Sequence, residues 1–262
     1  MSEILHYSLF TVNYSLYKGD PMSQSNLKVS IVEHTPNPEN IVALAAKMCY
    51  SKCSVDELRE KISKNDQREF IKKLIGMGHL TPIEHVSITY AVEGVSRALL
   101  AQITRHRIAT FCVKSQRYVG EHSSASKETF NYIIPPSIKK LGDKYVRVFD
   151  EQMKTIQGFY DFWHDKLGES EKTVETQNED ARFVLPNAAE TKFVFTMNAR
   201  ELFHFFSLRL CMRAQWEIRA LAGQMYKLAL KTAPVLFSYA GAPCKFGNCK
   251  EGTLKCKKGT TR

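Results

Sequence analysis

The 262-residue chain lacks several features that would assign it to a common class. It contains no run of about 18 apolar residues, so the sequence predicts no transmembrane helix. Its first residues have neither a cationic start followed by an apolar stretch nor a cleavage motif of small residues, and we expect a soluble, cytoplasmic protein. No G-x-G-x-x-G follows a predicted strand, because Gly76-Met77-Gly78 lacks the third glycine, and this excludes a Rossmann-type dinucleotide site.

Acidic residues are also in the minority. The chain has 27 Asp and Glu residues and 37 Lys and Arg residues, which gives a formal net charge of +10. That charge favours anionic partners but does not choose between nucleic acid, nucleotides, polyglutamylated folates and acidic surfaces.

The apolar pattern predicts an α+β fold that combines a mixed sheet with long helices. Strands are expected at 28–33, 86–92 and 192–197, with a further strand or an extended crossing at 132–136. Helices are expected at 38–49, 97–107, 137–167, 175–185, 199–210 and 214–231, and one or two more at 56–77. We expect three parts: a loosely ordered extension (1–27), a catalytic domain (28–240) and a tail rich in Cys and Lys (241–262).

One short segment concentrates cations and hydrogen-bond donors. Arg105-His106-Arg107 is followed, after seven residues, by Ser115 and then by Arg117. Arginine forks suit phosphate and carboxylate groups. If 97–107 is helical, with Ser96 as its N-cap, Arg105 and Arg107 diverge and are able to hold two different anions. The alternative is a solvated basic end of a helix, which complements the helix dipole.

Two further blocks admit a structural and a functional reading. In 78–85 (GHLTPIEH), Thr81 and Glu84 fit a capping box around Pro82, and the spacing of the two histidines is not that of a metal-binding H-E-x-x-H motif. In 198–217 (NARELFHFFSLRLCMRAQWE), Asn198 is a suitable N-cap, and Arg200 and His204 share a helix face. Arg209 is expected on the opposite face.

The spacing of R-H-R, Ser and Arg resembles the signature of the flavin-dependent thymidylate synthases. The resemblance extends over about 29–239 and includes both blocks above and 45–51 (AAKMCYS). It implies the non-Rossmann fold of that family and a homotetramer with active sites between subunits. It also implies a reaction in which NADPH reduces bound FAD, 5,10-methylenetetrahydrofolate supplies one carbon to dUMP, and the reduced flavin supplies the hydride that completes dTMP, with release of tetrahydrofolate.

The resemblance also implies roles for individual residues. Positions that match FAD contacts are Thr81, Arg105, His106, Arg107, Asn198, Arg200 and His204. Positions that match dUMP contacts are Gln102, Arg105, Ser115, Gln116, Arg117, Arg182 and Arg209. Arg209 matches the arginine that polarises the pyrimidine, and His79 and Glu84 match further active-site positions.

Some residues depart from the family pattern or suggest other chemistry. His204 replaces an Asn of some members and Val113 replaces a frequent Glu or Gln, from which we expect altered affinity rather than an altered reaction. Ser115 lacks an evident base, so we interpret it as a phosphate donor rather than a nucleophile. The apolar neighbours of Cys112 predict a buried, inert thiol, and Cys211 is likewise not expected to act as a nucleophile.

Three cysteines stand in the tail. Cys244, Cys249 and Cys256 suggest a zinc site, although their spacing is irregular and a tetrahedral site needs a fourth ligand from elsewhere. The alternative is a reduced, flexible tail.

Two rival functions remain at this level. The basic charge and the Cys/Lys tail also fit a nucleic-acid-binding protein, and an inactive paralogue would keep the fold without turnover. Retention of Arg182 and Arg209 with the rest of the motif set argues against both.

Overall fold

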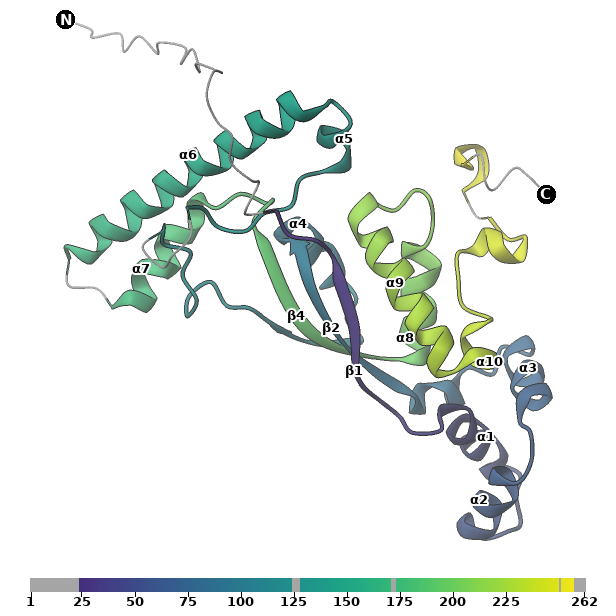
Figure 1. Ribbon diagram of the computed structural model, residues 1–262. Coiled ribbons are helices and arrows are strands. Elements are labelled where there is room, and N and C mark those ends of the chain that lie inside the picture. Colours follow the sequence, from purple (N-terminus) through teal and green to yellow (C-terminus); the bar gives the residue numbers. More distant parts are fainter. Residues whose placement is uncertain (1–23, 124–127, 171–172, 250, 257–262) are drawn as a thin grey trace, which may run out of the picture.

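The computed structural model describes residues 24–123, 128–170, 173–249 and 251–256 (Figure 1). Most of the predicted N-terminal extension, residues 1–23, lies outside the described residues, as do the last six residues of the tail. The strands are β1 (Lys28–His34), β2 (Ser87–Ser96), β3 (Ala109–Val113) and β4 (Glu190–Asn198). The helices are α1 (Pro38–Met48), α2 (Val55–Ser63), α3 (Arg68–Gly76), α4 (Arg97–Ile103), α5 (Pro136–Lys139), α6 (Asp143–Gly168), α7 (Val174–Ala181), α8 (Ala199–Arg209), α9 (Trp216–Thr232) and α10 (Pro234–Phe237). Short 3₁₀ turns are η1 (Thr81–His85), η3 (Arg182–Val184), η4 (Pro243–Phe246) and η5 (Gly252–Leu254).

The described strands form one sheet in the order β1-β2-β4-β3, and every neighbouring pair is antiparallel. The α+β class is therefore confirmed, but the expectation of a mixed sheet was wrong for these four strands. Strand β3 was not predicted, because five residues between two basic segments carry too little alternation to stand out. At 132–136, where a strand or an extended crossing was expected, the chain forms only isolated bridges, at Tyr132.

One face of the sheet packs on helices and forms the main core. Buried side chains alternate along β2 and β4, as period-two strands require. They meet α8, α9 and α10, which lie together beside the sheet in Figure 1. Tyr90 of β2 stacks on Phe195 of β4 at 5.6 Å, and Phe205 and Phe206 of α8 are fully buried in the same core. This packing fixes α8 against the end of β4.

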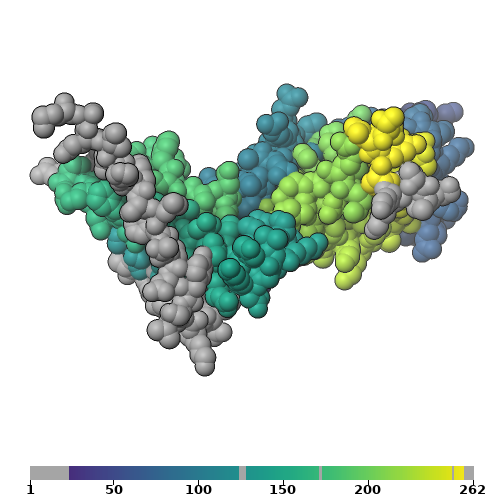
Figure 2. Space-filling view, turned by 90° about the horizontal axis from the view of Figure 1, so that it is seen from above, coloured from purple at the N-terminus to yellow at the C-terminus, as the bar shows by residue number. Residues whose placement is uncertain are grey.

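Helices α6 and α7 form a second region at the far end of the sheet. A smaller apolar cluster, which includes Phe130, Tyr132 and Met153, holds α6 there. The single helix predicted at 137–167 is interrupted because Gly142 has a φ of 98°, in the region that favours glycine and ends a helical run. Figure 2 shows the α6–α7 end and the α1–α3 end at opposite sides of the molecule.

Helix α4 is shorter than predicted and does not carry the R-H-R segment. The Ser96 side chain accepts from Leu99 N at 3.1 Å, which confirms the predicted N-cap. The helix ends at Ile103, and Arg105-His106-Arg107 lies in the turn that leads into β3. The chain must leave the helix here because the buried side chain of His106 turns toward α8.

Within the described part of the chain, the helices are too short or too polar for any of them to cross a bilayer.

Candidate functional site

The turn after α4 and the exposed side of α8 border a cavity of about 660 Å³. Its lining is mostly charged and polar, and comprises Glu84, Arg105, His106, Arg107, Ile108, Asn198, Arg200, Glu201, His204, Leu208 and Arg209. Four arginines thus face one space from segments about a hundred residues apart in the sequence.

Helix α8 is positioned by its N-cap residue. Asn198 ends β4, and its side-chain oxygen accepts from Glu201 N at 2.9 Å, so the predicted N-cap is confirmed. Arg200 and His204, one turn apart, both border the cavity, as their predicted common face requires. Arg209 was expected on the opposite face, yet it borders the same cavity, because its side chain reaches back to the R-H-R turn.

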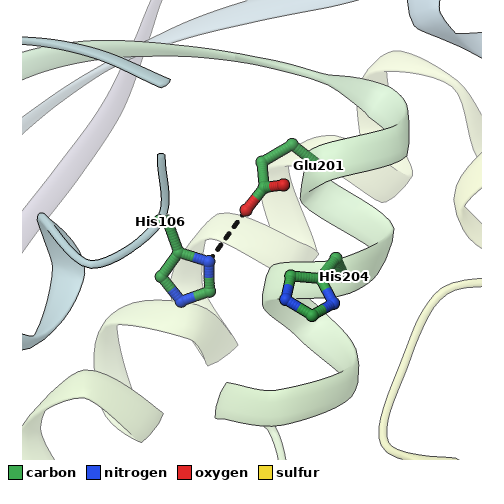
Figure 3. A group of neighbouring side chains, drawn as sticks. All are labelled: His106, Glu201 and His204. Carbon is green, nitrogen blue, oxygen red and sulfur yellow. Dashed lines mark hydrogen bonds and ion pairs between the residues drawn. The ribbon is translucent and has the colours of Figure 1, made fainter. Parts of the chain in front are cut away.

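A buried chain of polar groups connects α8 to this turn. His106 and Glu201 are only 5% and 7% exposed, and His106 Nδ1 lies 2.8 Å from Glu201 Oε1 (Figure 3). Arg209 Nε donates to His106 Nε2 at 3.2 Å. Because arginine only donates, Nε2 must accept, and the ring proton therefore lies on Nδ1 and is donated to Glu201. The two partners together select one tautomer of His106.

The electrostatics of this network keep His106 neutral. Burial lowers the pKa of His106 below its ordinary value; the hydrogen bond to Glu201 opposes this, and the charge of Arg209 adds to the lowering. Burial likewise lowers the pKa of Arg209, with a further contribution from Arg105, but an arginine remains charged at any working pH. The site therefore presents fixed positive charge beside a neutral imidazole.

Glu84 does not act as the predicted cap. Thr81 is the first residue of η1 rather than its N-cap, and the turn has no side-chain capping bond. The carboxylate of Glu84 instead forms an ion pair with Arg200 at the edge of the cavity. Both side chains are about half exposed, so the pair adds little stability. Its effect is to offset one of the four positive charges.

Most of the residues matched to dUMP contacts lie elsewhere. Arg117 forms ion pairs of 2.7 and 2.6 Å with Glu175 and Glu179 on α7. Arg182 Nε donates to Glu179 O at 3.0 Å, which places Arg182 beside the same residues. Gln102, Ser115, Gln116, Arg117 and Arg182 do not line the cavity.

A further arginine accompanies this second cluster. Burial lowers the pKa of Arg97, and the nearby charge of Arg182 lowers it further. Arg97 was not predicted as a site residue, because at the start of α4 it looked like an ordinary helix residue.

His79 and Thr81 are also separate from the cavity. His79 is exposed and borders a mostly apolar pocket of about 500 Å³, together with Tyr50, Phe70 and Met77. Thr81 is exposed at the start of η1. Of the residues matched to FAD contacts, the cavity thus brings together all but Thr81.

The cysteines differ from expectation at one position. Cys112 is exposed rather than buried, because it points to the outer face of β3 while Phe111 and Val113 point inward. Cys211 is half-buried. The tail cysteines 244, 249 and 256 are free and half-buried.

Two groups of possible metal ligands occur among the described residues, and neither contains a tail cysteine. One is His106, Glu201 and His204, inside the cavity (Figure 3); the other is His122, His164 and Asp165. Glu201 was missed because its only sequence signal, an acid three residues after an N-cap, does not reveal a partner 95 residues away. The zinc site in the tail stays a prediction.

Comparison of the sequence with known proteins places the chain in a family. A family profile described as "thymidylate synthase complementing protein" matches residues 30–235. A protein of Clostridium tetani is 47% identical over 241 residues, covering 88% of this chain and 94% of its own length. A Geobacter sulfurreducens protein is 45% identical over 232 residues (88% and 94%), and one of Pyrococcus furiosus 37% over 233 residues (87% and 91%). Each of the three is named flavin-dependent thymidylate synthase.

Proposed function

The chain belongs to the family of flavin-dependent thymidylate synthases, and on that premise we propose that it converts dUMP to dTMP with 5,10-methylenetetrahydrofolate as carbon donor and NADPH-reduced FAD as hydride donor. As a member it is an FAD-dependent methyltransferase of dTMP synthesis. The observation that carries the proposal is the cavity with four arginines, in which Arg209 is held by the buried pair His106 and Glu201.

The residues around the cavity fit a flavin dinucleotide. Arg105, Arg107 and Arg200 supply the positive charge that a pyrophosphate needs, without a glycine-rich turn. Asn198 and His204 add polar groups at the N-terminal half of α8. We therefore assign the FAD site to this cavity and its phosphate contacts to side chains, in a non-Rossmann manner.

FAD held in this cavity and reduced by NADPH would supply the hydride that converts the transferred carbon into a methyl group. The chain's own residues align the reactants and stabilise charge that develops on the uracil ring. Arg209 is placed for the second role, because Nε is occupied by His106 and the two terminal nitrogens remain available to the cavity. Glu201 acts only through His106, by holding the tautomer that accepts from Arg209.

The position of the dUMP residues supports active sites shared between subunits. Arg105 and Arg209 border the cavity, whereas Ser115, Arg117 and Arg182 lie at the α7 end. A second chain that brings its α7 end to the cavity would let a single dUMP contact both sets. We therefore propose a homotetramer, with His79 and Thr81 approaching the site in the same way.

The proposal is tested with the purified full-length protein loaded with FAD. Anaerobic NADPH is added with and without dUMP while the flavin absorbance is recorded, and dTMP is then measured after addition of 5,10-methylenetetrahydrofolate. We expect bleaching of the flavin that dUMP accelerates, followed by dTMP. Protein that binds no FAD, or that bleaches without forming dTMP, would contradict the proposal.

A further inference from the structure

The second group of possible metal ligands lies outside the cavity and is not used by the proposed reaction. His122 belongs to the segment that follows β3, whereas His164 and Asp165 are neighbours near the end of α6. Their ligand atoms all lie within 4.8 Å of one another. His122 Nε2 is 3.0 Å and His164 Nδ1 is 3.8 Å from the same oxygen, Asp165 Oδ1. The two imidazole ring centroids are 4.7 Å apart.

We propose that His122, His164 and Asp165 bind a divalent transition-metal ion, with Zn²⁺ as the best fit, and that this ion joins the segment after β3 to α6. Zinc takes imidazole nitrogen and carboxylate oxygen at about 2.0–2.2 Å, so two ligand atoms at a tetrahedral angle are roughly 3.3–3.5 Å apart. The separations of 3.0 and 3.8 Å lie on either side of that value. Three protein ligands leave a fourth position for water.

The backbone around His122 is already held on α6 without an ion. Glu121 N donates to the Tyr160 hydroxyl at 3.1 Å, and Gln157 Nε2 donates to Glu121 O at 2.8 Å. On the other side, Ser123 N donates to Asp161 Oδ1 at 3.1 Å. Because both neighbours of His122 are fixed, binding an ion needs only small side-chain movements and little additional ordering.

The exposure of the ligands suits an ion that enters from solvent. The side chains of His122 and His164 are 22% and 16% exposed, whereas Asp165 is 66% exposed. A hydrogen bond between His122 and Asp165 explains the shorter separation by itself. His164, which also stacks on Tyr160, has its Nδ1 3.8 Å from the same oxygen, too far for a hydrogen bond. One ion satisfies all three groups.

The ion would act on the segment that carries Ser115 and Arg117. That segment runs from the end of β3 to His122, and Lys114 and Glu121 form an ion pair across it. A metal at His122 would add a further link between its far end and α6, which packs against the helix α7 that pairs with Arg117. The expected role is structural: the ion stabilises the fold and the position of these residues.

Zinc binding is tested on the FAD-loaded full-length protein in which Cys244, Cys249 and Cys256 are replaced by Ser, so that tail thiols do not compete. Isothermal titration with Zn²⁺ and absorbance titration with Co²⁺ measure stoichiometry, affinity and ligand type. We expect one ion per chain, a tetrahedral Co²⁺ spectrum without thiolate charge-transfer bands, and a rise in melting temperature of several degrees with excess Zn²⁺.

Three variants identify the ligands. The affinity for Zn²⁺ should fall in each of His122→Ala, His164→Ala and Asp165→Asn. Each loss should exceed the roughly 10- to 100-fold that removal of a residue hydrogen-bonded to a metal ligand causes. Melting curves without metal confirm that each variant folds, and His34→Ala, which removes a histidine outside both groups, is the matched control. Absence of binding, or affinity unchanged in Asp165→Asn and His164→Ala, overturns the proposal. Neither readout depends on dTMP formation.

Discussion

The carboxylate of Glu201 is predicted to control the orientation of Arg209 through His106. It is 7% exposed and accepts from His106 Nδ1 at 2.8 Å. In Glu201→Ala, the buried Nδ1–H loses its acceptor, at a cost of about 1–3 kcal/mol. The ring avoids that cost by moving the proton to Nε2, but Nε2–H then faces Arg209 Nε–H, donor against donor.

Either outcome releases Arg209 from its fixed orientation. We expect kcat for dTMP formation to fall by about 10- to 100-fold, as when other groups that orient an active-site residue are removed. The stoichiometry of bound FAD should be unchanged, because Arg105, Arg107 and Arg200 remain. In Glu201→Gln, the amide oxygen still accepts from Nδ1. The value of kcat should therefore stay within about 3-fold of the parent, which corresponds to the smallest free-energy change expected for one hydrogen bond.

The measurements are single-turnover dTMP formation, FAD titration and melting temperature for each variant. Leu202→Val serves as the control, because it changes a buried neighbour on α8 that packs in the main core. Full kcat in Glu201→Ala despite a lower melting temperature would show that Glu201 is only structural. Equal losses in the Ala and Gln variants would show that its charge matters rather than the tautomer.

Three further predictions follow from the same structure. Because the pKa of His106 is lowered in the folded state, its contribution to stability is present above the ordinary value of 6.5 and is lost as pH falls from there toward the folded value. His106→Asn should remove this part of the pH dependence of the unfolding free energy, measured by urea denaturation. An unchanged pH profile in the variant would contradict this prediction. Burial raises the pKa of Glu217 above 4.5, although the hydrogen bonds from Ser96 oppose this, so the contribution of Glu217 to stability is present below that value and is lost as pH rises through the folded pKa. The unfolding free energy of the parent relative to Glu217→Gln should therefore fall over that pH range. A difference in unfolding free energy that does not change with pH would refute the burial of this charge. Arg117→Ala should raise KM for dUMP at least about 10-fold, as the loss of a charged hydrogen bond predicts. The melting temperature should change little, because the ion pairs of Arg117 are partly exposed. A large loss of stability with an unchanged KM would show that Arg117 only stabilises the contact with α7.

Local patterns account for the parts of the fold that the sequence predicted well. Alternation along β2 and β4 and the N-caps Ser96 and Asn198 depend on residues a few positions apart, and the structure contains them all. The capping box at Thr81 also looked local, but Glu84 forms an ion pair with Arg200 of a distant helix instead. Cys112 was misjudged because apolar neighbours in sequence lie on the other face of a strand.

The motif residues, the absence of a Rossmann turn and the positive charge are properties of the sequence alone, and they sufficed to indicate the family and the chemical class of its ligands. Tertiary structure decided which of those residues share a space. It turned Arg209 back to the R-H-R segment and paired His106 with Glu201 across 95 positions. It also paired Arg117 with two glutamates of α7. It also brought His122 to His164 and Asp165. The physical reason is that hydrogen bonds and ion pairs depend on distances of about 3 Å, which the packing of the sheet against its helices sets, whereas sequence patterns report only neighbours along the chain.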